Sequence, residues 1–338
     1  MLFIDRNGEA AGAVLGALSC ADYATRLEDE LSAVYGKSVA ATASADAALH
    51  TALKLCGVDS GDYVFVPTFT FYSYIATVVY AGAVPVFLDC DPNTRCVSAA
   101  ALETALVWSE LQGKPPRAVV VDNAFGSIAD FDVIAPLCKA WSAPLIELCC
   151  DAVGGEYKGR PCGGNGDYGV ICCDKRLTGG GGAIVCGEDR PAAWEFSRVK
   201  YTSHENHDYR INNFDAALWL QQRSVSDKLT ARARKNLDAL AANLDCVAPP
   251  TDGDAATYAL TKAAGKIAEL RAAGYSVKKP PLVHALPQYA DCHYFEHEPH
   301  YSACRAFDDY CLISMDLPAL SRMKLIRMLK TACAAQHN

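Results

Sequence analysis

The first half of the chain alternates short apolar runs with longer segments whose apolar residues recur at helical spacing. We predict strands at residues 38–43, 63–66, 85–89, 118–122 and 144–148, and helices at residues 45–55, 71–80, 99–110 and 130–141. Continuous apolar strands separated by helices are typical of a parallel sheet that helices cover on both faces. The pattern therefore predicts an α/β fold.

The pattern changes after residue 190. Helices are predicted at residues 216–244, as one long helix or a pair, and near residues 263–273 and 317–335. The run P-P-T-D-G-D at residues 249–254 is typical of a loop. We therefore predict a large domain at residues 1–248 and a small α/β domain at residues 249–338.

Two features point to chemistry at one edge of this sheet. Asp89 and Asp122 end predicted strands, and binding sites of parallel sheets lie at the carboxyl ends of the strands. Lys175 enters a turn that contains four glycines, from Gly179 to Gly182. A lysine in such a turn suggests a Schiff-base residue whose backbone approaches a cofactor closely. The alternative is a solvated lysine beside a glycine loop.

Composition excludes several classes of protein. The chain has 338 residues, is 51% hydrophobic and carries a net charge of −8, with no basic stripe for nucleic acid. No signal peptide and no segment apolar enough to span a membrane is evident, so we expect a cytoplasmic protein. The sixteen cysteines include no C-x-x-C pair, and several lie in apolar runs. We expect them to be buried free thiols rather than a disulfide framework.

Histidines and cysteines gather near residue 300. Cys292, His293, His297, His300 and Cys304 could present metal ligands on a helix. Pro299 lies inside this run and disfavours a continuous helix, so we predict a polar loop without a metal.

Another polar loop precedes the long helix. We expect its histidines, His204 and His207, to be solvated.

Ordered landmarks along the chain resemble the DegT/StrS-type sugar aminotransferases. The match extends from about residue 18 to 329. Its landmarks are S-A-D-A-A-L-H from Ser44, G-D-Y-V-F-V-P-T-F-T-F from Gly61, G-A-V-P-V-F-L-D from Gly82, P-L-I-E from Pro144, G-D-Y-G from Gly166 and Y-R-I-N-N from Tyr209.

This resemblance implies a fold-type I pyridoxal phosphate (PLP) transferase. Its large domain would hold a mostly parallel, seven-stranded-type sheet between helices, with a small α/β domain at the C-terminus. It also implies transfer of an amino group from an amino-acid donor to a nucleotide-linked keto-sugar. The active unit would be a homodimer, or a heterodimer with an active paralogue.

The resemblance also assigns residues to the cofactor. Lys175 would form the Schiff base, and Phe71 would stack on the pyridine ring. Ser44 and Ala45 would begin the helix whose N-terminus holds the phosphate. Asp151 would face the phenolic oxygen of the ring.

Four positions depart from the family pattern. Leu148 stands where a carboxylate pairs with the ring nitrogen. At the phosphate, Asp46 replaces a threonine, Cys172 falls near a serine position, and Asp208 replaces an asparagine from the neighbouring subunit. A carboxylate 4 Å from a phosphate costs about 4 kcal/mol at an effective dielectric constant of 20, unless a residue such as Arg210 compensates.

Asp46 suggests a specific hypothesis. An acid in the first turn of a helix can accept hydrogen bonds from the free N–H groups there. Asp46 would then fill the phosphate site itself. Two functions follow from these residues: a PLP-dependent aminotransferase, or an inactive paralogue that dimerises with or scaffolds an active one.

Overall fold

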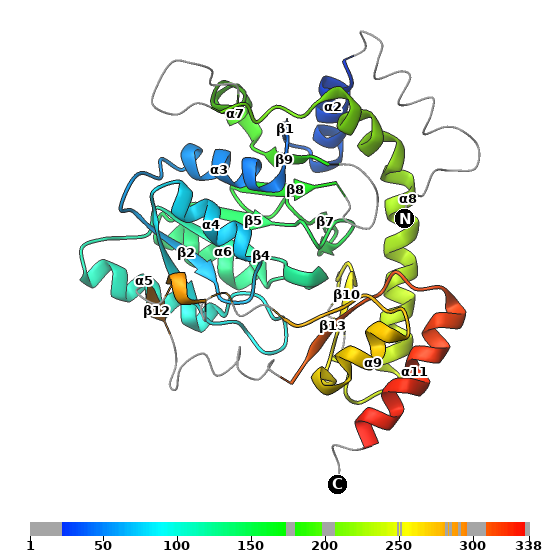
Figure 1. Ribbon diagram of the computed structural model, residues 1–338. Coiled ribbons are helices and arrows are strands. Elements are labelled where there is room, and N and C mark those ends of the chain that lie inside the picture. Colours follow the sequence, from blue (N-terminus) through cyan, green and yellow to red (C-terminus); the bar gives the residue numbers. More distant parts are fainter. Residues whose placement is uncertain are drawn as a thin grey trace.

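The computed structural model describes residues 22–173, 180–197, 207–248, 250, 252–280, 283, 286–289, 292–295 and 309–334. Within them an eight-stranded sheet forms the centre of the molecule (Figure 1). Its strands, in spatial order, are β1 (Val39–Thr42), β9 (Gly182–Val185), β8 (Tyr168–Cys172), β5 (Leu145–Leu148), β4 (Ala118–Asp122), β2 (Tyr63–Pro67), β3 (Val84–Leu88) and β12 (His293–Phe295).

The sheet is mostly parallel, as the sequence predicts. Only β9 runs against its neighbours β1 and β8. Seven strands lie between residues 39 and 185, and the eighth, β12, is added at the edge beside β3 by a segment from the C-terminal part of the chain.

Helices cover both faces of the sheet. One face is covered by α3 (Ala45–Leu55), α4 (Tyr72–Tyr80) and α7 (Arg190–Ser197), which share one buried apolar cluster with it. The other face is covered by α2 (Tyr23–Tyr35), α5 (Ala99–Leu111), α6 (Phe131–Ala140) and the start of α8 (Asn213–Ala241). We call these the α3 face and the α5 face. Polar N-caps begin several of the helices: Asp22, Ser44, Ser98, Asp130 and Asn212.

The long helix α8 is continuous, so the alternative of a helix pair is wrong. Its second half packs in a separate apolar cluster against a smaller sheet. That sheet has the order β10 (Tyr258–Thr261), β13 (Cys311–Ser314), β11 (Val277–Lys278), and its helices are α9 (Ile267–Ala272) and α11 (Ala319–Ala334). The domain boundary at residue 248 stays a prediction, since α8, which precedes it, packs with the smaller sheet, and β12, which follows it, pairs with β3 of the central sheet.

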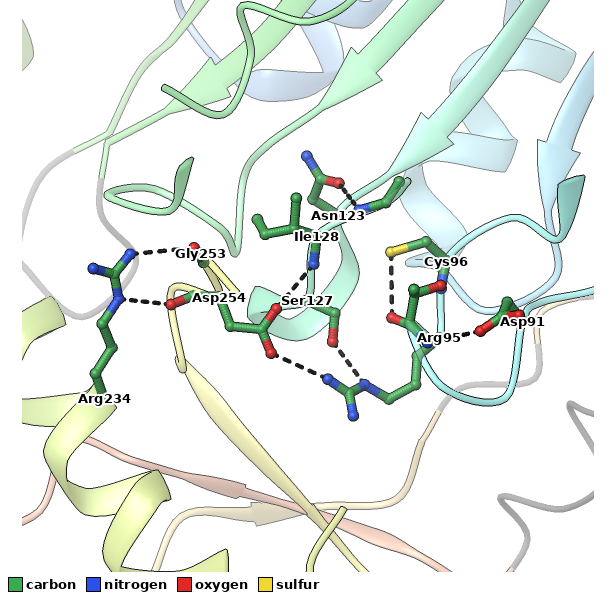
Figure 2. Close-up of polar contacts among 11 residues, drawn as sticks. Asp91, Arg95, Cys96, Asn123, Ser127, Ile128, Arg234, Gly253 and Asp254 are labelled. Carbon is green, nitrogen blue, oxygen red and sulfur yellow. Dashed lines mark hydrogen bonds and ion pairs between the residues drawn. The ribbon is translucent and has the colours of Figure 1, made fainter. Parts of the chain in front are cut away.

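A buried polar network joins the central sheet to the segment that leads into the smaller sheet (Figure 2). Arg95, in the loop after β3, donates from Nε to Ser127 Oγ at 2.7 Å and pairs through Nη2 with Asp254 Oδ2 at 3.3 Å. The other oxygen of Asp254 accepts from the Ile128 N–H at 3.1 Å. From α8, Arg234 Nε donates to the Asp254 carbonyl at 2.7 Å.

Twelve cysteines of the described residues are free thiols, and most of these are buried, as expected. Cys246 takes part in a disulfide bond, which was not predicted from the sequence. Among the described residues, no helix is both long and apolar enough to cross a membrane.

Candidate functional site

The N-terminus of α3 lies against the glycine turn that enters β9. Ser44 caps the helix, since its Oγ accepts from the Ala47 N–H at 3.1 Å. A Cβ atom at Gly182 would meet the Ser44 carbonyl oxygen at 2.3 Å and the Ala45 nitrogen at 2.6 Å. Glycine is therefore required there because the backbone itself packs on the start of the helix. This arrangement leaves a helix N-terminus at the carboxyl end of the sheet, where an anion can bind.

Asp46 does not fill this site in the way predicted. Ser44 supplies the cap, and Asp46 Oδ1 is shielded from solvent without a hydrogen bond to any described residue. The hypothesis that Asp46 satisfies the free N–H groups is therefore wrong. The reason is geometric: the N-cap side chain, two residues earlier, reaches the amide of the first turn.

Leu148 ends β5 on the α3 face and is fully buried. It belongs to an apolar cluster with Phe125, Cys150 and Cys172. No carboxylate occupies this position, and the strand's own acid, Glu147, alternates to the opposite face.

A carboxylate lies beside Leu148 on the next strand. Asp122, the last residue of β4, is the register partner of Leu148 and is 2% exposed. Its Oδ2 accepts a 2.6 Å hydrogen bond from the hydroxyl of Thr70. Ala118 and Val120 belong to the cluster on the α3 face, so alternation directs Asp122 to that face as well.

Aromatic side chains pack in the apolar cluster on the same face. Phe71 lies 5.1 Å, between ring centroids, from Phe125, which in turn lies 4.9 Å from Phe69. Tyr74 is buried, and burial raises the pKa of its phenol, with the nearby Cys150 and Asp122 adding to the effect. The Phe71 ring predicted to stack on the cofactor therefore lies on the same face as Leu148 and Asp122.

Cys172 ends β8, and Asp151 lies in the loop after β5. The Cys172 thiol donates to the Cys150 carbonyl at 3.3 Å, so it points toward the loop after β5. Asp151 is buried, and its carbonyl accepts from the Thr257 hydroxyl at 2.5 Å. This bond ties the predicted ring-facing residue to the segment that leads into the smaller sheet.

Asp208 is paired within its own chain. Arg210 binds it with both arms of the guanidinium group, at 2.7 Å from Nε and 2.6 Å from Nη2. Arg210 therefore offsets the negative charge of Asp208, as the sequence suggested. The Ala43 N–H donates to the Tyr209 carbonyl at 2.6 Å, which holds this segment beside the start of α3.

His207 is buried rather than solvated, which corrects the prediction. Its ring stacks on Tyr209 at 4.2 Å, and its Nε2 lies 2.8 Å from the Phe196 carbonyl oxygen. Tyr209 Oη in turn lies 2.8 Å from Nδ1 of His50 on α3. His204 lies outside the described residues.

Lys175 lies outside the described residues, which end at Cys173 and resume at Gly180. The two ends of this gap are joined, because the Cys173 N–H donates to the Gly181 carbonyl at 3.3 Å. The Gly180 N–H donates to Asp215 Oδ1 at 2.9 Å on α8. The role of Lys175 stays a prediction.

A buried polar network on the α5 face was not predicted from the sequence. Glu147 accepts from Asn123 Nδ2 at 2.8 Å and from the Asn165 N–H at 2.7 Å. Burial raises the pKa of Glu147, and these hydrogen bonds oppose the shift. The alternation of side chains along a strand could have indicated this network, since Glu147 and Leu148 must point to opposite faces of the sheet.

A cavity of about 580 Å³ lies beside the end of β8, between α2 and α8. Its walls include Tyr35, Cys173, Trp219 and Arg223. Cys173 and Trp219 belong to the α5 face, whereas Cys172, which also lines the cavity, belongs to the Leu148 cluster on the α3 face.

The described residues contain no group of three or more histidine, cysteine, aspartate or glutamate side chains arranged for a metal. His297, His300 and Cys304 lie outside that part of the chain. The prediction of no metal there stays a prediction.

The described residues fit PLP in outline. Where the phosphate of PLP would bind, α3 presents a helix N-terminus packed on Gly182. Asp46, whose Oδ1 makes no hydrogen bond to a described residue, adds a negative charge there that would repel the phosphate. At the ring end, Phe71 offers an aromatic face, and Asp122 lies beside the apolar Leu148. The described residues thus bring a helix N-terminus, an aromatic ring and a buried carboxylate to one edge of the sheet, with no carboxylate at position 148.

Comparison with known sequences identifies the relatives. The DegT/DnrJ/EryC1/StrS aminotransferase family matches residues 11–269. EpsN of Bacillus subtilis (strain 168) is 36% identical over 221 residues, which cover 61% of this chain and 57% of EpsN. GDP-perosamine synthase of Escherichia coli O157:H7 is 30% identical over 210 residues, covering 59% of this chain and 56% of that enzyme.

A third relative is the L-glutamine:2-deoxy-scyllo-inosose aminotransferase of Micromonospora echinospora. It is 32% identical over 219 residues, covering 58% of this chain and 50% of that enzyme. The chain therefore spans about half the length of the relatives it matches.

Solved structures show the same fold at low identity. An aminotransferase of the DegT DnrJ EryC1 StrS type from Brucella abortus has a TM-score of 0.83 and 22% identity, with 98% of this chain and 99% of that chain covered. The PLP form of Spr1654 from Streptococcus pneumoniae has a TM-score of 0.84 and 20% identity, with 98% and 97% covered. The predicted fold-type I α/β architecture is thus confirmed. Because the family match extends over most of its length, this chain belongs to the DegT/DnrJ/EryC1/StrS aminotransferase family.

Proposed function

We propose that this chain transfers an amino group from an amino-acid donor to a keto-sugar, with PLP as its cofactor and Lys175 as the lysine that holds it. The observation that carries the proposal is the grouping, at the carboxyl end of one sheet, of the α3 N-terminus, Phe71 and Asp122. PLP, when bound, supplies an electron sink for amino transfer.

Different residues of the chain would bind different parts of PLP. The amides at the start of α3 would meet the phosphate, and Gly182 allows the backbone to pack closely behind them. Phe71 would cover one side of the ring. The pairing of Asp208 with Arg210 reduces the negative charge that reaches the site.

The relatives suggest the substrate class. One is named for a cyclitol ketone with L-glutamine as donor, and another for a GDP-linked amino sugar. We propose a nucleotide-linked keto-sugar as acceptor, and glutamate or glutamine as donor, for this chain. Two chains would form the active unit, as a homodimer or with an active paralogue.

The test begins with the absorption spectrum of the purified protein after incubation with PLP. Borohydride reduction and peptide mapping follow, with Lys175→Ala as the matched control. A reduced adduct on Lys175, together with amino transfer to a nucleotide-linked keto-sugar detected by mass spectrometry, supports the proposal. A protein that takes up no PLP under these conditions contradicts it.

A second candidate function is a non-catalytic paralogue that dimerises with an active aminotransferase. Two observations favour it: Leu148 is fully buried among apolar side chains, and Asp46 adds charge at the phosphate end. The test is co-expression with an active family member, followed by measurement of the mass and PLP content of the complex. A heterodimer with PLP on only one subunit supports this candidate.

A further inference from the structure

We propose that Asp122 supplies the carboxylate that pairs with the ring nitrogen of PLP, in place of the missing carboxylate at Leu148. The inference rests on the proposed function. A carboxylate at the ring nitrogen keeps the ring protonated, which strengthens PLP as an electron sink for amino transfer. Because Leu148 has no acidic group, such a carboxylate would come from another part of the site.

Strand register places Asp122 next to the required position. Asp122 and Leu148 are paired residues on neighbouring parallel strands, and both are the last residues of their strands. Neighbouring strands lie about 4.8 Å apart. The carboxylate is therefore displaced by one strand spacing along the same edge of the sheet, and alternation directs it to the same face.

The surroundings of Asp122 hold it in a defined orientation. It is 2% exposed, and the Thr70 hydroxyl donates to its Oδ2 at 2.6 Å. Thr70 is itself fully buried and directly precedes Phe71. The residue that would stack on the ring and the residue that orients the carboxylate are thus neighbours in one short segment.

The other buried acids near this edge are less suitable. Glu147 lies on the opposite face, where both of its oxygens accept hydrogen bonds from Asn165 or Asn123. Asp89 follows β3, which is separated from β5 by β4 and β2, and its Oδ1 accepts from the Cys90 N–H. Asp151 lies beyond the end of β5, in the place that faces the phenolic oxygen by resemblance.

The experiment measures ring protonation directly, independently of turnover. Wild type, Asp122→Asn, and the double variant Asp122→Asn with Leu148→Asp are each loaded with PLP labelled with ¹⁵N in the ring. The ¹⁵N chemical shift reports whether the ring nitrogen carries a proton. Asparagine keeps an acceptor for Thr70, and thermal unfolding checks that each variant folds.

We expect a protonated ring in wild type and loss of that proton in Asp122→Asn. A nearby carboxylate shifts such a protonation equilibrium by one to three pKa units, which is about 10-fold to 1,000-fold. The double variant, with the carboxylate at position 148, is expected to be protonated again. A purely structural role for Asp122 would leave the ring protonated in a folded, PLP-loaded Asp122→Asn variant.

Two results overturn the inference. If Asp122→Asn binds PLP with its ring still protonated, Asp122 is not the partner, although the proposed function survives. If wild type binds no PLP, the proposed function fails and the inference fails with it. Whether wild type binds PLP therefore distinguishes failure of this inference alone from failure of the proposed function.

Discussion

Ser44 caps α3 with its side chain, whereas Asp46, two residues later, leaves Oδ1 shielded from solvent without a hydrogen bond to any described residue. Helix capping by hydrogen bonds therefore does not explain this aspartate. A carboxylate at the N-terminus of a helix interacts favourably with the helix dipole, but it repels a phosphate that binds at the same place.

Replacing Asp46 with threonine should strengthen PLP binding. Removing one carboxylate near the phosphate should lower the dissociation constant by about tenfold or more, since each tenfold corresponds to about 1.4 kcal/mol. Titration followed by absorption or fluorescence checks this. The control is Glu103→Gln, which removes an exposed carboxylate from α5. Equal effects of the two variants would mean that only net charge matters.

Gly182→Ala should destabilise the protein. The added Cβ would meet backbone atoms of Ser44 and Ala45 at 2.3 and 2.6 Å, and backbone cannot move aside as a flexible side chain can. We expect a loss of about 1–3 kcal/mol in the free energy of unfolding, as for overpacking in a core. Gly265→Ala is the matched control, because a Cβ there meets nothing within 4 Å. Urea denaturation of both variants measures the difference.

Arg95→Ala should cost about 3–5 kcal/mol of stability, because it leaves the buried carboxylate of Asp254 without its cationic partner. Arg232→Ala breaks the more exposed pair with Asp316, and we expect a loss below about 1 kcal/mol. Chemical denaturation compares the two. A similar small loss in both would show that the network in Figure 2 contributes little.

Glu147 should make stability depend on pH. Burial raises the pKa of Glu147 above its ordinary value of 4.5, so the folded state binds the proton more tightly than the unfolded chain. The resulting stabilisation is fully present below pH 4.5 and is lost as the pH rises through the raised pKa. Glutamine does not titrate, so the stability advantage of wild type over Glu147→Gln should be largest near pH 4. A difference that grows toward neutral pH would contradict the direction of the shift.

Two thiols should react slowly in the folded protein. Burial raises the pKa of Cys56 to about 12, and that of Cys138 to about 12 as well. At pH 8 a thiol with this pKa is about 1,000-fold less ionised than one with a pKa of 9, and the thiolate is the reactive form. Mass-spectrometric labelling of native and denatured protein measures the rates. Fast labelling of Cys138 in the native protein would contradict its burial.

The predicted elements agree closely with the structure where the signal is local. The helix at residues 45–55 and the strand at residues 118–122 have the predicted bounds, because apolar spacing and capping act over a few neighbouring residues. The edge strand β12 was not predicted. Its pairing with β3 depends on a contact between segments about two hundred residues apart.

The candidate site, too, was predicted in part from local sequence and in part only from the tertiary structure. The sequence by itself determined the family, the α/β fold and the absence of a carboxylate at Leu148, because these follow from residue types in a fixed order along the chain. Only the tertiary structure decided that Asp122 stands beside Leu148, that Arg95 meets Asp254, and that Ser44 rather than Asp46 caps α3. The register between strands and the direction of side chains depend on packing across the whole sheet, which no short stretch of sequence encodes.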